Sequence, residues 1–198
     1  MLLATRSAGK LRELRPLFES YGFRAIDLVE AGLLETPAED DLEAFATFEE
    51  NARAKARHFF RLSGQPTVAD DSGLVVDALD GRPGVHSKRW SDRADLRGQA
   101  LDDENNRKLL RELDGTSNRT AHYVCAAAFV DGAREIVRRG EVSGTIIDSP
   151  RGTGGFGYDP LFNSTELGRT FAEVSAADKE RVSHRGRAFR ALLDALGA

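Results

Sequence analysis

Two adjacent carboxylates, Asp70 and Asp71, end a short apolar run and are followed at once by Ser72 and Gly73. Carboxylates at the end of a buried strand present hard oxygen ligands. Mg²⁺ takes one or two such ligands, while waters and substrate phosphates complete its coordination shell. Because Asp, Ser and Gly also form turns, the alternative is a plain turn between two short strands, 68–69 and 74–76. Phosphate-binding residues elsewhere in the chain would favour the metal interpretation.

A candidate anion-binding segment lies near the start of the chain. Residues 5–10, Thr-Arg-Ser-Ala-Gly-Lys, join a predicted strand at 2–5 to the N-terminus of a helix predicted over 10–21. Backbone N–H groups and the helix dipole attract anions at such a junction, and Lys10 adds a full positive charge. The segment lacks the first glycine of a Walker loop, so it does not predict a P-loop. An ordinary strand-to-helix turn is the alternative.

A polar stripe recurs every four residues on a helix predicted from Asp40 to about Ser63: Glu43, Thr47, Asn51 and Lys55. This spacing places the four side chains on one helical face. A stripe with a carboxylate at one end and an ammonium at the other suits a metal ion and a phosphate. The alternative is a solvated face on which Asp40 and Glu43 only form a capping box.

Two further segments near the C-terminus could bind a nucleotide. The glycine-rich loop 152–157 permits close backbone approach, but it leads into Asp159-Pro160 instead of opening a helix, so it does not predict a dinucleotide fold. Phe156 or Tyr158 could stack on a base. The second segment contains three side chains that can carry positive charge, those of Lys179, His184 and Arg185, at the junction of two predicted short helices.

The remaining elements predict a mixed α/β sheet. Early strands alternate with helices, a helix is predicted over 101–113, and Asp131-Gly132 is a hairpin turn between strands at 121–129 and 135–147. With 198 residues, 40% of them hydrophobic, the chain is expected to form one domain. We expect α/β architecture with a mixed central sheet flanked by helices.

Composition excludes several classes of function. The net charge of −4 argues against binding to a nucleic acid backbone, and no apolar run is long enough to span a membrane. The single Cys125 excludes an intrachain disulfide and a multi-cysteine zinc site, and it suits a reducing compartment. We therefore expect a cytoplasmic protein that binds neither nucleic acid nor membrane.

Taken together, the motifs resemble those of the inosine triphosphate pyrophosphatase family, which hydrolyses non-standard purine nucleoside triphosphates such as ITP, dITP and XTP. They occur in the family's order and span nearly the whole chain. The matching segments are Thr5 to Glu13, Thr47 to Ala52 with Lys55-Ala56, Ala69 to Leu74, Gly81 to Arg89, Gly152 to Phe162, and Lys179 with Ser183 to Gly186.

The resemblance implies a role for each matching residue. Asp71 would be the catalytic proton acceptor and, with Glu43, a ligand of Mg²⁺. The substrate-binding residues would be Thr5, Arg6, Ser7, Ala8, Gly9, Lys10, Lys55, Ser72, Phe156, Gly157, Tyr158, Asp159, Lys179, His184 and Arg185. The family further implies a homodimer in which residues 1–198 form a single domain, with an elongated sheet and two lobes around an active-site cleft.

Some residues depart from the family pattern. Ser7 replaces the usual Asn, so one phosphate contact is expected to be shorter or bridged by water. Glu43 is followed by Ala-Phe instead of Thr-Gly, so the match to the family pattern around this expected metal ligand is incomplete. His86 and Lys88 replace Tyr and Ala, so contacts with a partner subunit or substrate could differ there.

The chemistry implied is hydrolysis between the α- and β-phosphates, giving a nucleoside monophosphate and pyrophosphate. The lysines would offset the negative charge of the triphosphate. His184 or Arg185 would donate to the purine 6-oxygen, a bond that the 6-amino group of ATP cannot accept. Two alternatives stay open: a pyrophosphatase acting on modified pyrimidine or standard deoxynucleotides, and a nucleotide-binding sensor without catalytic activity.

Overall fold

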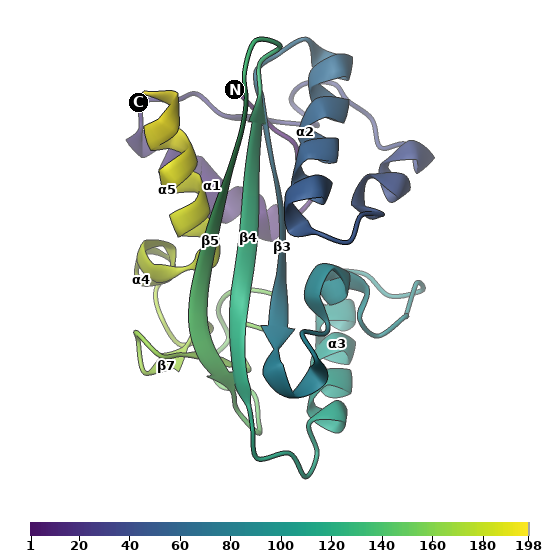
Figure 1. Ribbon diagram of the computed structural model, residues 1–198, viewed down its shortest axis with the longest axis vertical. Helices are drawn as coiled ribbons and strands as arrows, with labels where there is room; N and C mark the ends of the chain where they lie inside the picture. Colours follow the sequence, from purple (N-terminus) through teal and green to yellow (C-terminus); the bar gives the residue numbers. More distant parts are fainter. Residues whose placement is uncertain (198) are drawn as a thin grey trace. The chain divides into compact units, whose positions relative to one another are not determined.

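The computed structural model describes residues 1–197, and for Asp40 its backbone only. Its seven-stranded sheet has the order β2-β1-β3-β4-β5-β6-β7. Strand β1 pairs in parallel with β2 and β3, whereas β6 pairs antiparallel with β5 and β7. The predicted mixed α/β sheet flanked by helices is thus confirmed (Figure 1). The strands are β1 Leu2–Leu3, β2 Ile26–Asp27, β3 Thr67–Val76, β4 Thr120–Val130, β5 Glu135–Ile146, β6 Phe162–Ser164 and β7 Arg169–Thr170.

Five α-helices and three 3-10 helices accompany the sheet in the described part of the chain. The α-helices are α1 Ala8–Ser20, α2 Phe48–Ser63, α3 Gly98–Glu112, α4 Ala176–Val182 and α5 His184–Leu196. The 3-10 helices are η1 Pro37–Glu43, η2 Asp77–Leu79 and η3 Gly84–Arg89. None of the helices among the described residues is long and apolar enough to cross a membrane.

The chain divides into two compact units. Unit 1 contains Met1–Asp71, Cys125–Gly140 and His184–Ala198, and unit 2 contains Ser72–Val124 and Glu141–Ser183. The backbone passes between them several times because β3, β4 and β5 each contribute residues to both units.

The core of unit 1 is formed by two helices packed on the sheet. Leu14, Leu17 and Phe18 recur at helical spacing on α1, and Phe189 and Leu192 do so on α5. The rings of Phe18 and Phe189 meet edge to face, with centroids 5.8 Å apart. The strands complete this cluster with Leu3 of β1, Val68 of β3 and Cys125, Ala127 and Phe129 of β4, so one face of the central strands is covered by α1 and α5.

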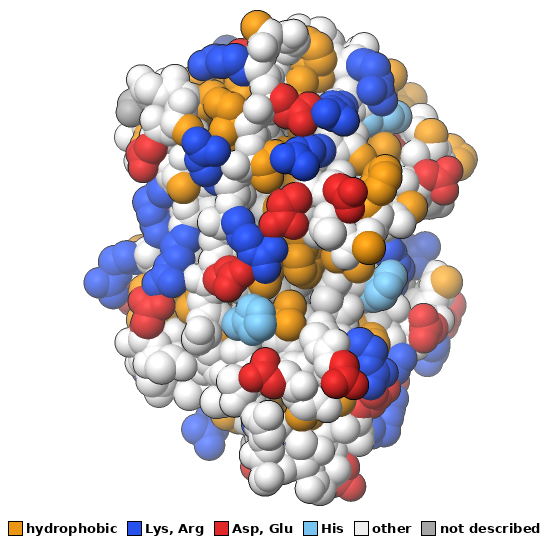
Figure 2. Space-filling view, in the orientation of Figure 1, with side chains coloured by type: hydrophobic (Ala, Val, Ile, Leu, Met, Phe, Trp, Pro, Cys, Tyr) orange, Lys and Arg blue, Asp and Glu red, His pale blue; other side chains and the backbone are white. Residues whose placement is uncertain are grey.

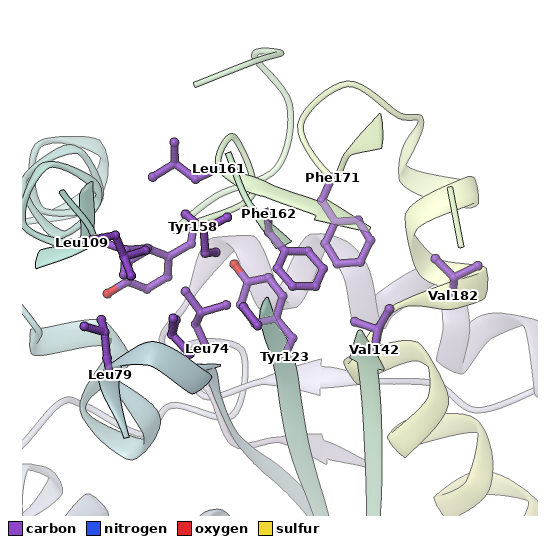
Figure 3. Close-up of a cluster of buried hydrophobic side chains, with 14 residues drawn as sticks. Leu74, Leu79, Leu109, Tyr123, Val142, Tyr158, Leu161, Phe162, Phe171 and Val182 are labelled. Carbon is purple, nitrogen blue, oxygen red and sulfur yellow. The ribbon is translucent and has the colours of Figure 1, made fainter. Parts of the chain in front are cut away.

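The core of unit 2 is rich in aromatic rings (Figure 3). Tyr123, Phe162 and Phe171 pack together, with ring centroids 4.7 Å apart for the first two and 5.2 Å apart for the two phenylalanines. Leu109 of α3 and Tyr158 of the glycine-rich loop join the same cluster. This core therefore ties α3 and the loop around Tyr158 to the same hydrophobic layer.

The turn considered for residues 70–73 is wrong, because β3 runs without interruption from Thr67 to Val76. Strand β1 pairs only with Thr67 and Val68 at the start of β3, whereas β4 is its neighbour on the other side. The local turn preference of Asp, Ser and Gly is overridden by this pairing. Asp70 and Asp71 consequently lie inside a central strand and are only 2% and 4% exposed.

The helix predicted from Asp40 to Ser63 is also wrong at its start. Residues 37–43 form the separate 3-10 helix η1, and α2 begins at Phe48. The N-cap of α2 is Thr47, whose hydroxyl accepts a hydrogen bond from the backbone N–H of Glu50. Asp40 and Glu43 therefore do not form the start of α2 that the predicted capping box implied. The side chain of Asp40 lies outside the described residues. Only Asn51 and Lys55 of the predicted stripe belong to α2 itself.

Candidate active site

The two aspartates of β3 face opposite sides of the sheet, as consecutive strand residues must. Asp70 points to the side of α1 and α5, where its Oδ2 atom lies 3.0 Å from Lys10 Nζ and 3.3 Å from Arg185 Nε. Asp71 points to the side of α2, where Asn51 Nδ2 donates to its Oδ2 atom over 2.9 Å. One strand thus supplies two carboxylates to two different environments.

Asp70 belongs to a buried ion-pair network. Arg185 is 3% exposed, and its Nη1 atom lies 2.5 Å from Glu13 Oε2 while its Nε atom contacts Asp70. Although burial alone would raise it, the positive charges of Lys10, Arg185 and Lys55 hold the pKa of Asp70 well below its ordinary value. Asp70 therefore stays ionised and is a weak proton acceptor.

Asp71 has the opposite electrostatic character. Burial raises the pKa of its carboxyl above the ordinary value of 3.8, and the negative charge of Glu43 adds to this effect. Lys55, Lys10 and the hydrogen bond from Asn51 oppose the increase without cancelling it. A carboxylate whose pKa moves toward neutrality is better matched to accepting a proton from water.

Lys55 is buried beside two carboxylates. Its Nζ atom lies 2.7 Å from Glu43 Oε1 and 3.8 Å from Asp71 Oδ1. Burial of the ammonium would lower its pKa, but Glu43, Asp71 and Asp70 raise it overall, so Lys55 carries its charge. The stripe predicted Glu43 and Lys55 at opposite ends of one helix, whereas the contact between them forms because Glu43 lies in η1 and not in α2.

The carboxylates of Asp71 and Glu43 determine which metal ion could bind here. Among the described residues, no three His, Cys, Asp or Glu side chains are grouped to hold a metal. Glu43 and Asp71 share Lys55 as a common positive partner, and the charge of Glu43 raises the pKa of Asp71. A buried carboxylate, Asp71, beside the partly exposed carboxylate of Glu43 fits Mg²⁺, which takes one or two carboxylates and obtains its other ligands from water and phosphates.

Residues 5–10 form the junction of β1 and α1. Ser7 is the N-cap of α1, and its hydroxyl accepts from the backbone N–H of Lys10 over 3.3 Å. Ala8 and Gly9 form the first turn, and Thr5 Oγ1 accepts from the N–H of Ser7. The junction therefore has the geometry of an anion-binding helix N-terminus beside Lys10.

Arg6 of the same junction holds a different segment. Its guanidinium makes a two-point contact with the Glu39 carboxylate, through bonds of 3.1 and 2.8 Å, and donates to the carbonyl of Leu33. Glu39 lies in η1, the element that also carries Glu43. Arg6 therefore anchors η1, which sequence analysis did not indicate because Arg6 and Glu39 are 33 residues apart.

The glycine-rich loop and Lys179 form a second cluster, within unit 2. Lys179 Nζ lies 2.5 Å from Asp159 Oδ2 and 4.9 Å from the centroid of the Phe156 ring. The same Asp159 oxygen accepts from the backbone N–H of Phe156 over 2.8 Å. Lys179 and Asp159 are both buried, so the structure brings together three of the predicted substrate-binding residues.

Other predicted substrate-binding residues occupy different positions. Tyr158 is 4% exposed, packs in the core of unit 2 and donates its hydroxyl to the carbonyl of Ser87, which leaves Phe156 as the aromatic residue suited to stacking. His184 is the first residue of α5 and is buried. Ser72 follows Asp71 in β3.

Sequence analysis missed the residues that orient these groups. Glu13 contacts Arg185 across 172 positions of the chain, and Asp102 and Asn106 of α3 contact Gly157. Asn51 belongs to the polar stripe and to the matching segment Thr47 to Ala52, but no contact with Asp71 was predicted for it. These partners are far apart in sequence, so no local pattern indicates them.

Comparison with known proteins identifies the family. Residues 1–195 match the model of the Ham1 family, and the chain belongs to that family. A protein of Geobacter sulfurreducens named dITP/XTP pyrophosphatase is 46% identical over 200 residues, which cover 100% of this chain and 96% of that protein. The resemblance inferred from the motifs is thereby confirmed.

Two solved structures share the fold. A Ham1 protein from Coxiella burnetii superposes with a TM-score of 0.84 at 34% identity, covering 99% of this chain and 97% of that one. A nucleoside-triphosphatase, or dITP/XTP pyrophosphatase, from Mycobacterium abscessus gives a TM-score of 0.71 at 42% identity, covering 97% of each chain.

Proposed function

We propose that the protein hydrolyses dITP, ITP and XTP between the α- and β-phosphates, releasing the monophosphate and pyrophosphate. Such an enzyme clears non-standard purine nucleotides from the nucleotide pool. The observation that carries the proposal is Asp71, a buried carboxylate with a raised pKa, held by Asn51 and placed beside Lys55. Relatives named dITP/XTP pyrophosphatase support the choice of substrate.

In this proposal Asp71 accepts the proton of the attacking water. The hydrogen bond from Asn51 fixes the orientation of the carboxylate, and burial keeps its pKa above that of an ordinary aspartate. Lys10 and Lys55 bind the triphosphate together with the N-terminus of α1, so positive charge is in place before the phosphoanhydride bond breaks. Thr5, Arg6 and residues 7–9 shape this phosphate-binding junction, and Ser72, the residue after Asp71 in β3, also belongs to the proposed substrate-binding set.

The proposed cofactor is Mg²⁺, held by Glu43 and Asp71. When bound, it supplies positive charge that stabilises the leaving pyrophosphate and lowers the pKa of a bound water. The protein contributes the two carboxylates and places the ammonium of Lys55 beside both of them. Arg6 maintains the position of Glu43 indirectly, by anchoring η1 at Glu39.

Selection of the purine is assigned to the second cluster and to His184. Phe156 packs against the ring, while Lys179 and Asp159 offer a donor and an acceptor beside it. The two proposed donors to the 6-oxygen are His184 and Arg185, and the guanidinium of Arg185 also contacts Asp70 and Glu13. Gly157 and Tyr158 complete the segment, Tyr158 from within the core.

The proposal extends to the state of the protein in the cell. We propose a cytoplasmic homodimer in which the chain forms one two-lobed domain, with small nucleotides as ligands and neither nucleic acid nor membrane as partners. The buried, lone Cys125 suits a reducing compartment. On the face seen in Figure 2, basic and acidic side chains are interspersed and do not gather into one basic surface. Light scattering during gel filtration measures the expected dimer mass.

A substrate panel tests the function directly. Purified protein with Mg²⁺ is given dITP, XTP, dATP, dCTP and a modified pyrimidine triphosphate, and pyrophosphate and orthophosphate are measured separately. We expect pyrophosphate from dITP and XTP, with the standard nucleotides at least about 10²-fold slower. Preference for a pyrimidine would replace the proposal with the pyrimidine alternative, and binding of dITP without turnover would indicate a sensor.

A further inference from the structure

The backbone of Gly157 is held from both sides by one face of α3. The N–H of Gly157 donates to Asp102 Oδ2 over 2.8 Å, and its carbonyl accepts from Asn106 Nδ2 over 2.9 Å. Asp102 and Asn106 are four residues apart, so their side chains lie one above the other on the helix. We call these two residues the α3 clamp.

The α3 clamp acts on a residue in an unusual conformation. Gly157 has a φ of +63°, in the left-handed region that most residues avoid, and no atom lies within 4 Å of a Cβ built there. A glycine with open space around it has many accessible conformations, so its observed orientation depends on the bonds to Asp102 and Asn106. Both clamp residues sit on a regular helix whose Leu109 is fully buried in the core of unit 2.

Hydrogen bonds and an ion pair next to Gly157 connect its orientation to the Phe156 ring and to Lys179. Asp159 Oδ2 accepts from the backbone N–H of Phe156 and contacts Lys179 Nζ, so residues 156–159 are tied on either side of Gly157. Lys179 in turn lies over the Phe156 ring. A rotation of the Gly157 peptide would therefore turn Phe156 away from Lys179 and Asp159.

The clamp is costly for the folded protein. Burial raises the pKa of Asp102, which means that the ionised carboxylate is disfavoured where it stands. Asn106 is 6% exposed, and its Oδ1 atom has no hydrogen-bond partner among the described residues. An apolar residue would avoid both costs, so packing alone does not explain two polar side chains at these positions.

We propose that Asp102 and Asn106 are positioning residues, which fix the nucleotide-contacting segment 156–159 in its binding conformation before substrate arrives. This inference rests on the proposed function of that segment. Preorganisation lowers the conformational cost of binding, so its loss weakens binding more than it slows the chemical step.

The test compares KM with kcat for dITP in matched variants. D102A and N106A each remove one hydrogen bond to Gly157 and should raise KM about tenfold, with kcat changed less than about twofold. D102N keeps an oxygen that can accept from the Gly157 N–H and should restore KM to within about threefold of wild type. D103A serves as the control, because Asp103 is exposed on the same helix and accepts a hydrogen bond from Gln99 and not from Gly157.

The outcomes separate this inference from the proposed function. If the wild-type protein releases no pyrophosphate from dITP, the proposed function is wrong, and this conclusion does not depend on the D102A variant. If the wild type is active and D102A raises KM no more than D103A does, the clamp has no positioning role. A purely structural role is recognised by equal losses in D102A and D102N, or by kcat falling with KM unchanged. Thermal unfolding of all four variants checks that each is folded.

Discussion

At the scale of single residues, Asp70 and Asp71 show how neighbours in one strand acquire different chemistry. Asp70 is surrounded by Lys10 and Arg185, which stabilise its charge, and Asp71 is buried with weaker compensation near Glu43. The pair looks uniform in sequence. Its two members differ because the strand pleat directs them to opposite faces, toward different helices.

The first prediction concerns D71N. Loss of the proposed base should lower kcat for dITP by at least about 10²-fold. Because the buried Asp71 charge is disfavoured in the folded state, its neutral replacement should leave the protein as stable as wild type or more stable at pH 7. Steady-state kinetics and thermal unfolding measure both effects. Near-normal turnover in folded D71N would remove Asp71 from the mechanism.

The second prediction concerns D70N, which should behave in the opposite way. Removing this charge leaves Lys10 and Arg185 with less compensation in a buried site, and the free energy of unfolding should fall by about 3 kcal/mol. Urea unfolding at pH 7 gives this value, and the exposed D148N variant is the comparison. A loss below that of D148N would mean that the network contributes little.

A third prediction concerns Lys55 and the proposed metal. K55M removes the ammonium that lies between Glu43 and Asp71, so Mg²⁺ should bind the nucleotide-free protein at least about tenfold more tightly. Turnover of dITP should fall, because Lys55 also binds phosphate in the proposal. Calorimetry with MgCl₂ measures the affinity, and K108M, which alters a lysine over Trp90, is the control. Weaker Mg²⁺ binding in K55M would argue against Glu43 and Asp71 as ligands.

At the scale of elements, the glycine-rich loop is a packed structure. A Cβ atom at Gly155 would lie 2.1 Å from Asp159 Oδ2, and one at Gly152 would lie 2.3 Å from the Ala172 carbonyl. Glycine is required at both positions, because the Asp159 side chain and the Ala172 backbone leave no room for a Cβ atom.

The fourth prediction follows from that packing. G155A introduces a methyl group against Asp159 at a φ of +71°, so it should displace the carboxylate from Lys179 and abolish most dITP binding. G168A is the matched control, since Gly168 has a φ of +62° with nothing within 4 Å and pays only the backbone strain of about 1 kcal/mol. Nucleotide affinity and thermal unfolding distinguish the two. Equal effects would show that strain, not contact with Asp159, is what matters.

The accuracy of the predicted elements depended on where their determinants lie. Helix α1, with Leu14, Leu17 and Phe18 at helical spacing, and the hairpin at Asp131-Gly132 were predictable because their patterns are local. The start of α2 was predicted too early, because Glu43 and Phe45 fit helical spacing. In the structure η1 ends at Glu43 and α2 begins only at Phe48. The strand through Asp70 was missed because it depends on pairing with β4, which lies about 50 residues away in sequence. The motifs named the candidate site residues, but not Asn51, Glu13 or the α3 clamp as their partners.

At the scale of the whole molecule, the two aspartates should leave opposite marks on stability as a function of pH. The folded-state pKa of Asp70 is depressed, so its contribution to stability is present above the ordinary value of 3.8 and is lost as pH falls through the folded pKa. The folded-state pKa of Asp71 is raised, so its contribution is present below 3.8 and is lost as pH rises through the folded pKa.

The fifth prediction is the form of two difference curves. The destabilisation of D70N relative to wild type should shrink toward zero at strongly acidic pH. The gain in stability of D71N relative to wild type should be near zero below pH 3.8 and should grow as pH rises through the folded pKa of Asp71. The kcat/KM of the wild type for dITP should increase over that same rise. Thermal unfolding and kinetics across pH measure all three, and parallel stability curves for the two variants would contradict the assignment.

The continuity of β3 also limits how the gene can change. A strand repeats every two residues, so inserting or deleting one codon between Thr67 and Asp70 would exchange the faces on which the two carboxylates stand. The chain would keep both aspartates and nearly its whole composition, yet the residue delivered to Asn51 and Lys55 would no longer be Asp71. Single-codon length changes here should therefore be eliminated even where most substitutions of nearby surface residues survive, whereas loops such as residues 92–97 should vary in length among homologous genes.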